Sequence, residues 1–438
     1  SGGKLTQSIL MLGFLSEEQV LRALEKHYGV PGMDVGNFEI DKLELVKLDG
    51  SKRLSIKSYA QSLDIYEDVL YPTIYADLLL LDGVELKTSF PIIGEEFIEL
   101  ELSSKKLNEP LKLKLQVVDI GNDNHVNDRG KVYKLGLVSE EYMVNQEGHF
   151  SRRYKDMNEN IVKSILEENL RTKKQIFLEE TRGITDILIT LMHPLEAIDM
   201  LKQDSISKKF KSSLFVFFEN QKGFNFTTIE NLFETGKEFI GDKVFFLDET
   251  NEASVSHIND RNILAYKQNN SSAIDTKIAE GLFTSVVTYD PISGDIERIF
   301  FDDQEKFKHP DDKEIPMTTS ILAAKHKKHR TGSRAFVVND TSKPKTYFED
   351  ILKKKAFLQR ILSNITDIYV YGDLALAAGD VITCNLPEQI GLTRVSKDNR
   401  LISGNYMIMS LRHMFTFDKN RKHMISARLI KGNFIEAP

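Results

Sequence analysis

The sequence predicts an α+β fold rich in β-strands, with two β domains, a mixed α/β insertion between them and a short N-terminal helical arm. Apolar residues follow a helical period near the N-terminus and change to period-two alternation at about residue 42. Period-two alternation returns near the C-terminus, after a middle region in which both patterns occur. The predicted segments are residues 1–41, 42–140, 141–365 and 366–438.

The first segment is predicted to be a helical arm. Ser16 stands before acidic residues and is a typical helix N-cap. Gly29 and Pro31 are residues that end helices. The apolar residues at roughly helical spacing are Leu10, Leu12, Leu15, Val20, Leu21 and Leu24.

The second segment is predicted to hold several short strands at regular spacing, which favours a barrel or a sandwich. Asp49-Gly50 is a hairpin turn signal. The stretch 121–129 is poor in apolar residues and rich in Asn and Asp, so we expect a loop there. The expected strands cover about 42–48, 62–66, 74–82, 96–102, 111–119 and 132–138.

The third segment mixes both kinds of element, and part of it is available to complete the second β domain. Residues 156–170 keep one apolar stripe, which predicts a helix. Pro194 favours the first turn of another helix, over 194–203. The β-prone run 214–218 opens a hairpin over 210–226. A strand, turn and strand over 289–301 and a helix over 346–363 complete the segment.

The last segment is predicted to be β again. Both faces of the run 406–415 are partly apolar, so we expect that strand to be covered on both sides. The expected strands cover 367–371, 380–385, 404–416 and 422–432.

Composition limits the possible classes of protein. With 438 residues and 41% hydrophobic residues, the chain can build more than one core. The single cysteine, Cys384, excludes an internal disulfide framework, and its apolar neighbours predict burial. A net charge of −7 argues against general phosphate binding. We find neither a run of apolar residues that spans a bilayer nor a signal-peptide pattern.

Motifs for nucleotide or acyl chemistry are missing from the sequence. Gly2-Gly3-Lys4 and Gly236-Lys237 lack the spacing and the hydroxyl of a phosphate-binding loop. No nucleophile elbow is found. We therefore predict no catalytic, cofactor-binding or metal-binding residues. The basic cluster 326–330 is expected to be a surface loop, with contact to a polyanion or a metal as alternatives.

Some polar residues and one aromatic segment admit two interpretations. His413 and His423 are predicted to lie on adjacent strands and to pair in a structural role. The phenylalanine-rich hairpin favours a core or a subunit interface over a ligand-binding surface. The acidic residues are expected at strand ends and turns, with acid–base chemistry as the alternative; they are Asp64, Glu67, Asp68, Glu95 and Glu96.

An ordered set of short motifs resembles one known family. The motifs are Leu63–Leu70, Asp82–Val84, Pro91–Glu96, Phe217–Asn220, Gly223–Phe226, Asp373–Leu376, Gly379–Ile382, Ser403–Tyr406, Arg412-His413 and Leu429–Lys431. In the same order, this set resembles the central tail hub proteins of contractile, T-even-like phage baseplates. The resemblance covers about residues 42–435.

The resemblance implies an architecture and a function. It implies two related β-barrel domains in each subunit and a homotrimeric ring of near six-fold symmetry. Such a ring adapts the six-fold tail tube to the three-fold spike, without enzyme activity or cofactor. The implied partners are the tail spike protein, the tube initiator and the baseplate wedge proteins. DNA would pass through the channel without specific binding. The chain would be assembled in the host cytoplasm, would lie in the virion tail and would not insert into a membrane.

The first forty residues resemble a different family. Leu12–Gln19 and Tyr28–Pro31 are similar to the small N-terminal domain of type II secretion and pilus ATPases. Tandem copies of that element bind a cyclic dinucleotide in some members, but this chain has one copy and carries Lys4 where an Arg is usual. We expect an arm that docks on a neighbouring baseplate protein. The alternative functions are a nucleotide-responsive secretion component and a tail-associated peptidoglycan hydrolase.

Overall fold

The computed structural model describes residues 38–83, 86, 90–104, 107, 109–121, 124–127, 130–237, 243–247, 261–270, 283–289, 294–302, 334–338, 364–386, 403–417 and 421–431. Three sequence predictions lie outside these residues: the helices of the N-terminal arm, the basic cluster 326–330 and the helix over 346–363.

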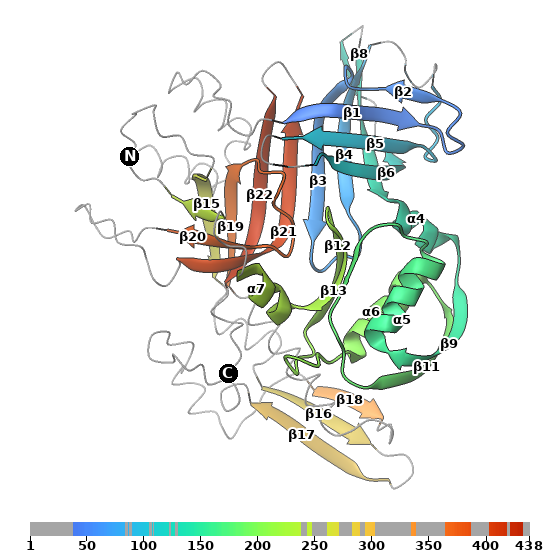
Figure 1. The fold of residues 1–438 in the computed structure, drawn as a ribbon, viewed down its shortest axis with the longest axis vertical. Coiled ribbons are helices and arrows are strands. Elements are labelled where there is room, and N and C mark those ends of the chain that lie inside the picture. Colours follow the sequence, from blue (N-terminus) through green and yellow to red (C-terminus); the bar gives the residue numbers. More distant parts are fainter. Residues whose placement is uncertain are drawn as a thin grey trace, which may run out of the picture.

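In the described residues, fourteen strands form one curled, mostly antiparallel sheet (Figure 1). Its N-terminal strands are β1 (Glu39–Val46), β2 (Arg53–Ser55), β3 (Ala60–Asp68), β4 (Tyr75–Asp82), β5 (Phe97–Ser103), β6 (Leu111–Ile120), β7 (Asn124–Asn127) and β8 (Gly130–Ser139). Its C-terminal strands are β14 (Val244–Phe246), β15 (Ile263–Asn270), β19 (Asn364–Tyr371), β20 (Val381–Asn385), β21 (Gly404–Thr416) and β22 (Lys422–Lys431).

The N-terminal and C-terminal strands meet in the middle of this sheet, where β3 pairs antiparallel with β21. Tyr66 lies opposite Arg412, and Ile65 lies opposite His413. In Figure 1 these strands stand side by side, while β1, β5 and β6 cross over them and close one side of a half-barrel. The apolar core of the half-barrel includes Leu43, Leu78 and Leu135. This fold agrees with the prediction of a β-rich chain.

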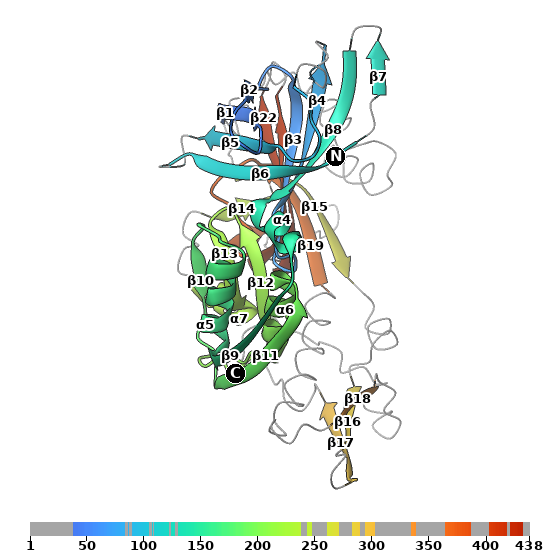
Figure 2. The ribbon, with the colours of Figure 1, turned by 90° about the vertical axis from the view of Figure 1, so that its right-hand side faces the viewer.

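The middle of the chain forms an α/β lobe beside the sheet (Figures 1 and 2). A three-stranded sheet has the order β10-β13-β12, and β9 and β11 form a separate ribbon. The elements are α4 (Glu140–Glu147), β9 (Phe150–Met157), α5 (Asn158–Ser164), a π-helical segment (Ile165–Asn169), β10 (Ile176–Leu178), β11 (Ile184–Met192), α6 (Pro194–Asp204), β12 (Phe215–Asn220), β13 (Gly223–Thr228) and α7 (Ile229–Lys237).

A further small sheet lies beyond the lobe, at the bottom of Figures 1 and 2. It contains β16 (Phe283–Tyr289), β17 (Ile296–Asp302) and β18 (Arg334–Val338), in the order β17-β16-β18. The second of the two strands predicted over 289–301 is present as β17. The first was placed wrongly, because Tyr289 ends β16 and pairs with Ile296.

The phenylalanine-rich hairpin β12–β13 belongs to two cores at once. Phe215 and Phe217 pack into the core of the α/β lobe. Val216 and Phe218 point the other way, toward a cluster that contains strand residues of the large sheet. Alternation therefore buries both faces, which confirms the prediction that this hairpin is core rather than an exposed ligand-binding surface.

Several boundaries differ from the sequence predictions. Residues 39–41 belong to β1 rather than to a helical arm. The expected loop over 121–129 contains β7, because the backbone pairs with β8 although its residues are polar. The helix expected from 156 begins at Asn158, after β9. The strand over 406–415 is buried on both faces only up to Met409. No helix among the described residues is long and apolar enough to cross a membrane.

Candidate functional site

The β12–β13 turn is the meeting point of three parts of the molecule: the α/β lobe, strand β3 and the loop between β19 and β20. The turn residues Gln221 and Lys222 lie between two fully buried strands. Gly223 begins β13 with a φ of +139°, and a Cβ there would lie 2.2 Å from the carbonyl oxygen of Gln175. Glycine at this position lets the turn approach the backbone of the lobe, so it fixes where the tip of the hairpin lies.

Glu67, on β3, holds this tip. Its carboxylate accepts hydrogen bonds from the backbone N–H of Gln221 and of Ala378, both at 2.8 Å. The side chain is buried, and burial raises the pKa of Glu67 to about 7. The sequence placed Glu67 among the turn residues, which was wrong. Its alternation with Leu63 and Ile65 already put it on the buried face of the strand, and this was the signal that could have identified it.

Amide side chains of the same turn extend the contact to the C-terminal half. The Nε2 of Gln221 donates to the carbonyl oxygens of Leu374 at 2.8 Å and Leu376 at 2.9 Å. Asn220 donates to the carbonyl oxygen of Ala378 at 2.9 Å. These bonds satisfy the backbone of a loop that packs against the hairpin, so the loop is fixed to the hairpin without regular secondary structure.

A charged group lies at the edge of this contact. The carboxylate of Asp380 forms ion pairs with the ammonium of Lys222 at 2.6 Å and with that of Lys243 at 2.8 Å. The two lysines come from the hairpin and from the segment before β14, so the loop is bound on both sides. Two cations around one half-buried carboxylate compensate its charge.

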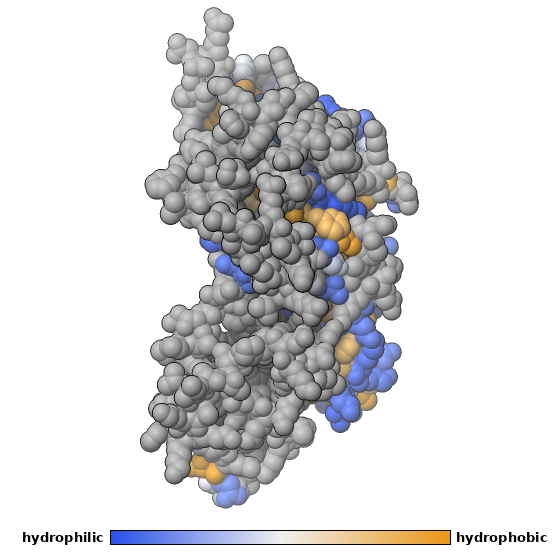
Figure 3. All heavy atoms as spheres, turned by 90° about the vertical axis from the view of Figure 1, so that its left-hand side faces the viewer, coloured by the Kyte–Doolittle hydropathy of each residue, from blue (hydrophilic) through white to orange (hydrophobic). Residues whose placement is uncertain are grey.

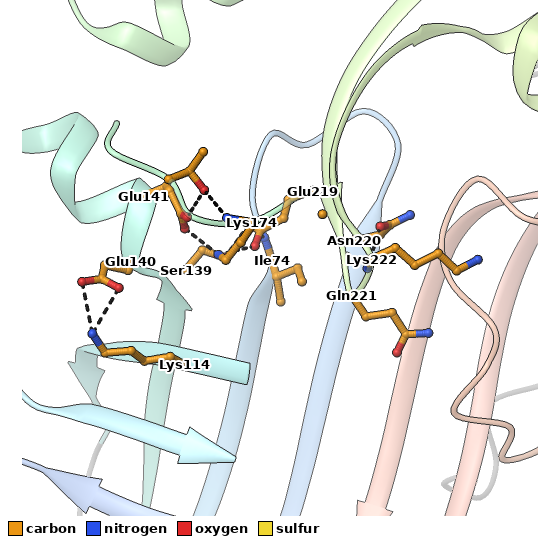
Figure 4. Close-up of polar contacts among 12 residues, drawn as sticks. Ile74, Lys114, Ser139, Glu140, Glu141, Lys174, Glu219, Asn220, Gln221 and Lys222 are labelled. Atoms are coloured by element: carbon orange, nitrogen blue, oxygen red, sulfur yellow. Dashed lines mark hydrogen bonds and ion pairs between the residues drawn. The ribbon is translucent and has the colours of Figure 1, made fainter. Parts of the chain in front are cut away.

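On the other side of the hairpin, Glu219 forms a second buried contact, drawn in Figure 4. Its carboxylate accepts hydrogen bonds from the backbone N–H of Ile74 at 3.1 Å and from the Ser139 hydroxyl. Lys174 lies 2.6 Å from Glu219 and 2.5 Å from Glu141. The cluster therefore joins β12 to the ends of β4 and β8.

Two carboxyl groups share one ammonium in this cluster. Burial raises the pKa of Glu219 and so favours its neutral form. Burial acts against the charged form of Lys174, but the two neighbouring carboxylates outweigh it and raise the pKa of Lys174. Lys174 therefore stays charged between the two carboxyl groups.

Two further buried carboxylates form hydrogen bonds within the lobe, near the start of α7. Glu179 accepts hydrogen bonds from the backbone N–H of Thr228 at 2.6 Å and from the hydroxyls of Thr227 and Thr228. Glu230 accepts one from the Ser212 hydroxyl at 2.6 Å, and burial raises its pKa to about 7. Both carboxylates lie near the N-terminus of a helix, where negative charge is stabilised.

The paired histidines, His413 and His423, and the cysteine, Cys384, are buried. The Nδ1 of His413 lies 3.0 Å from the Nε2 of His423, which confirms the predicted pair. The pair is diagonal, because the strand register places His423 opposite Phe415. Burial lowers the pKa of His413 to about 4. Cys384 is fully buried, as predicted, and burial raises the pKa of its thiol.

The other acidic residues named in the sequence analysis lie apart from the hairpin. Asp64 pairs with Arg412 at 2.9 Å. Asp68 accepts a hydrogen bond from the N–H of Leu70 and is a strand-end turn residue, as predicted. Glu96 is buried and binds Lys47 at 2.7 Å, whereas Glu95 is exposed.

The carboxylates of these clusters thus bind backbone N–H groups, hydroxyls, lysines and, for Asp64, an arginine. Across the described part of the chain, no three His, Cys, Asp or Glu side chains gather as a metal site requires. Among the described residues visible in Figure 3, hydrophobic side chains form small separate spots between hydrophilic ones. The hairpin site therefore fixes the parts of the molecule relative to one another.

Comparison with known proteins places this fold. No protein-family model and no curated protein matches the sequence. The chain is similar to the crystal structure of the tail protein from Neisseria meningitidis MC58, with a TM-score of 0.57 and 12% identity, over 92% of this chain and 99% of that one. It is also similar to the 43 kDa tail protein of prophage MuSo2 from Shewanella oneidensis, with a TM-score of 0.56 and 10% identity, over 91% and 99%. The chain thus has, over nearly its whole length, the fold of these tail proteins.

Proposed function

We propose that this chain is a structural subunit of a phage tail baseplate and that three copies form its central hub. The observation that carries the proposal is the similarity in fold, which spans 92% of this chain and 99% of the tail protein of Neisseria meningitidis. A match at full length relates the whole arrangement of sheets, lobe and loops, rather than one widespread motif.

The strand arrangement supports a ring in which each subunit contributes two similar units. The N-terminal strands β1–β8 and the C-terminal strands β14, β15 and β19–β22 meet at the β3–β21 pair. We infer that each set forms one of two related barrels, separated by the α/β lobe. Three such subunits would present six strand-built units around a three-fold axis. This geometry suits an adaptor between a six-fold tube and a three-fold spike.

The buried contacts of the hairpin suit a structural role rather than an enzymatic one. A subunit that transmits force between partners must keep its parts in fixed positions. Glu67 and Glu219 hold the hairpin to the sheet from two sides. The proposed partners are the spike protein, the tube initiator and the wedge proteins of the baseplate. In this proposal DNA passes through the ring without specific contacts.

Electron microscopy of the purified chain, alone and mixed with purified tail-tube protein, tests the proposal. We expect class averages of a three-fold ring with six similar lobes around an open channel in both samples. Isolated single subunits in the sample of the chain alone, or rings of another symmetry, would refute the hub.

A further inference from the structure

Helix α7 lies where the α/β lobe meets the C-terminal strands of the large sheet (Figure 1). Ile229 and Phe233 of α7 are buried in the same apolar cluster as Val381 of β20. A Cβ added to Gly236 would lie 2.4 Å from the Cγ2 of Val381, so the helix backbone lies directly against that strand. A change at the start of α7 would therefore reach the contact between the lobe and the sheet.

Two buried carboxyl groups lie at the start of this helix. Glu179 is 8% exposed and Glu230 is 9% exposed. The Oε2 of Glu179 accepts hydrogen bonds from the backbone N–H and the hydroxyl of Thr228, which directly precedes α7. The Oε1 of Glu230, in the first turn of α7, accepts a hydrogen bond from the Ser212 hydroxyl. One oxygen of each carboxyl group is thus fixed by donors.

The second oxygen of each carboxyl group is buried and has no hydrogen-bond partner among the described residues. These two atoms are Oε1 of Glu179 and Oε2 of Glu230. A buried carboxylate oxygen without a donor costs free energy, because it has lost its hydrogen bonds to water. The two groups also interact. Burial raises the pKa of Glu230 to about 7, and the negative charge of Glu179 acts in the same direction.

The charged groups on the segments around this pair have other positions or other partners. Arg182 and Lys211 are exposed, and Glu159 binds the backbone N–H of Thr181. The ion pairs nearby are Lys208–Glu180, Lys209–Glu234, Lys222–Asp380 and Lys243–Asp380. The N-terminus of α7 stabilises one negative charge, whereas a second buried charge would be repelled by the first. A single proton removes that second charge and gives both free oxygens a partner.

We propose that Glu179 and Glu230 share one proton and form a carboxyl–carboxylate hydrogen bond that holds the start of α7. Glu230 carries the proton on Oε2 and donates it to Oε1 of Glu179. Glu179 stays ionised against the N–H of Thr228, and neutral Glu230 still accepts the Ser212 hydroxyl through Oε1. Loss of the proton leaves two like charges in a buried site, and their repulsion opens the start of the helix.

The pair is therefore a pH-sensitive contact inside the lobe. The folded pKa of Glu230, about 7, lies above the ordinary value of 4.5, so the folded state binds the proton more tightly than the opened state does. The stabilisation is complete below about pH 4.5 and is lost as the pH rises through about 7. At higher pH the start of α7, and with it the contact to β20, becomes easier to open.

Infrared spectroscopy and hydrogen exchange test this proposal on the full chain. A protonated carboxyl group has a C=O stretch that an ionised carboxylate lacks, so spectra at pH 6 detect the shared proton. Hydrogen-exchange mass spectrometry, corrected for intrinsic rates, measures the opening equilibrium of residues 228–237 at pH 5, 6 and 7 in buffers with EDTA. The variant is Glu230→Gln. The control is Glu234→Gln, on the same helix but exposed and paired with Lys209.

We expect the protonated-carboxyl band in the difference spectrum of wild type minus Glu230→Gln and not in that of wild type minus Glu234→Gln. The glutamine amide donates permanently in place of the shared proton. The ratio of the opening equilibrium of the wild type to that of Glu230→Gln should therefore rise at least about tenfold between pH 5 and 7. The ratio of the wild type to the control should stay constant.

Absence of the band from the first difference spectrum, or equal pH dependence in the wild type and Glu230→Gln, would overturn the proposal. Stronger protection on replacing EDTA with calcium chloride at pH 7 would also overturn it, because the pair would then hold a cation rather than a proton. If Glu230→Gln does not fold, Glu67→Gln decides. A constant opening equilibrium of residues 228–237 in that variant from pH 5 to 7 overturns the shared proton, and a rise of about tenfold supports it.

Discussion

Glu67 shows how one residue can join distant parts of a chain. It bonds to Gln221 and Ala378, which lie 154 and 311 positions away in the sequence. Burying a carboxylate has a cost, and two backbone N–H groups offset only part of it. The raised pKa of Glu67, about 7, is the measurable consequence.

This pKa predicts how stability depends on pH. The folded pKa of about 7 lies above the ordinary value of 4.5, so the folded state binds the proton more tightly than the unfolded chain does. The stabilising contribution of protonated Glu67 is complete below about pH 4.5 and is lost as the pH rises through about 7. Between pH 5 and 7, the free energy of unfolding of the wild type should fall about 1 kcal/mol per pH unit more steeply than that of Glu67→Gln.

Urea denaturation of both proteins at pH 5, 6 and 7 measures this difference. Glu230 also has a pKa of about 7 and is present in both proteins, so the difference isolates Glu67. Parallel pH profiles would show that Glu67 does not titrate in this range.

Lys174 gives a second prediction at the scale of the residue. Lys174→Met leaves Glu219 and Glu141 without their cation and should lower the free energy of unfolding by about 3 kcal/mol. Adding Glu219→Gln should recover a large part of the loss. Lys114→Met is the control, because its ion pair with Glu140 is exposed and should be worth less than about 1 kcal/mol. Equal losses in the two single variants would contradict the account of this cluster.

Among the elements, the β12–β13 hairpin positions the site and depends on Gly223. In Gly223→Ala the new Cβ would meet the carbonyl oxygen of Gln175 at 2.2 Å, at a φ of +139°. We expect a loss of about 3–5 kcal/mol in the free energy of unfolding. Gly50 also has a positive φ, of +70°, but no atom lies within 4 Å of a Cβ added there. Gly50→Ala should therefore lower the free energy of unfolding by only about 1 kcal/mol. Thermal unfolding of both variants distinguishes a backbone clash from conformational strain alone.

A β-bulge near the end of β11, where the register shifts between Ile189 and Met192, predicts a substitution that stabilises the protein. Leu191→Gly removes the strain of a positive φ and loses little buried surface, because the leucine is exposed. Relative to Leu191→Ala, which keeps the strain, it should raise the free energy of unfolding by about 1 kcal/mol. Urea denaturation compares the two variants. A glycine variant no more stable than the alanine variant would contradict the claim that the positive φ of Leu191 is strained.

The elements that the sequence predicted best are those with a buried face. Strands β3, β4 and β21 alternate or are continuously apolar, so their pattern was visible. The ribbon was not predicted, because β9 is polar along most of its length and β11 is largely exposed. The π-helical segment after α5 was read as ordinary helix, since both share the same apolar stripe.

At the scale of the whole molecule, local sequence patterns could not predict which distant strands pair. The β3–β21 pair joins residues about 350 positions apart, such as Asp64 and Arg412. The cross-strand histidine pair was predicted because its strands are neighbours in the sequence as well as in space. The burial of Glu67 was predictable from its alternation with Leu63 and Ile65, but its partners are backbone groups of two remote loops, which no side-chain pattern reveals.

The central claim concerns the assembly, and native mass spectrometry of the purified chain over a range of concentrations tests it most directly. The chain has a mass of 50.0 kDa, so a trimer of three chains has a mass of about 150 kDa. The account predicts a dominant species at three times the chain mass that persists on dilution. A species at the mass of one chain at every concentration, or a dimer, would contradict it.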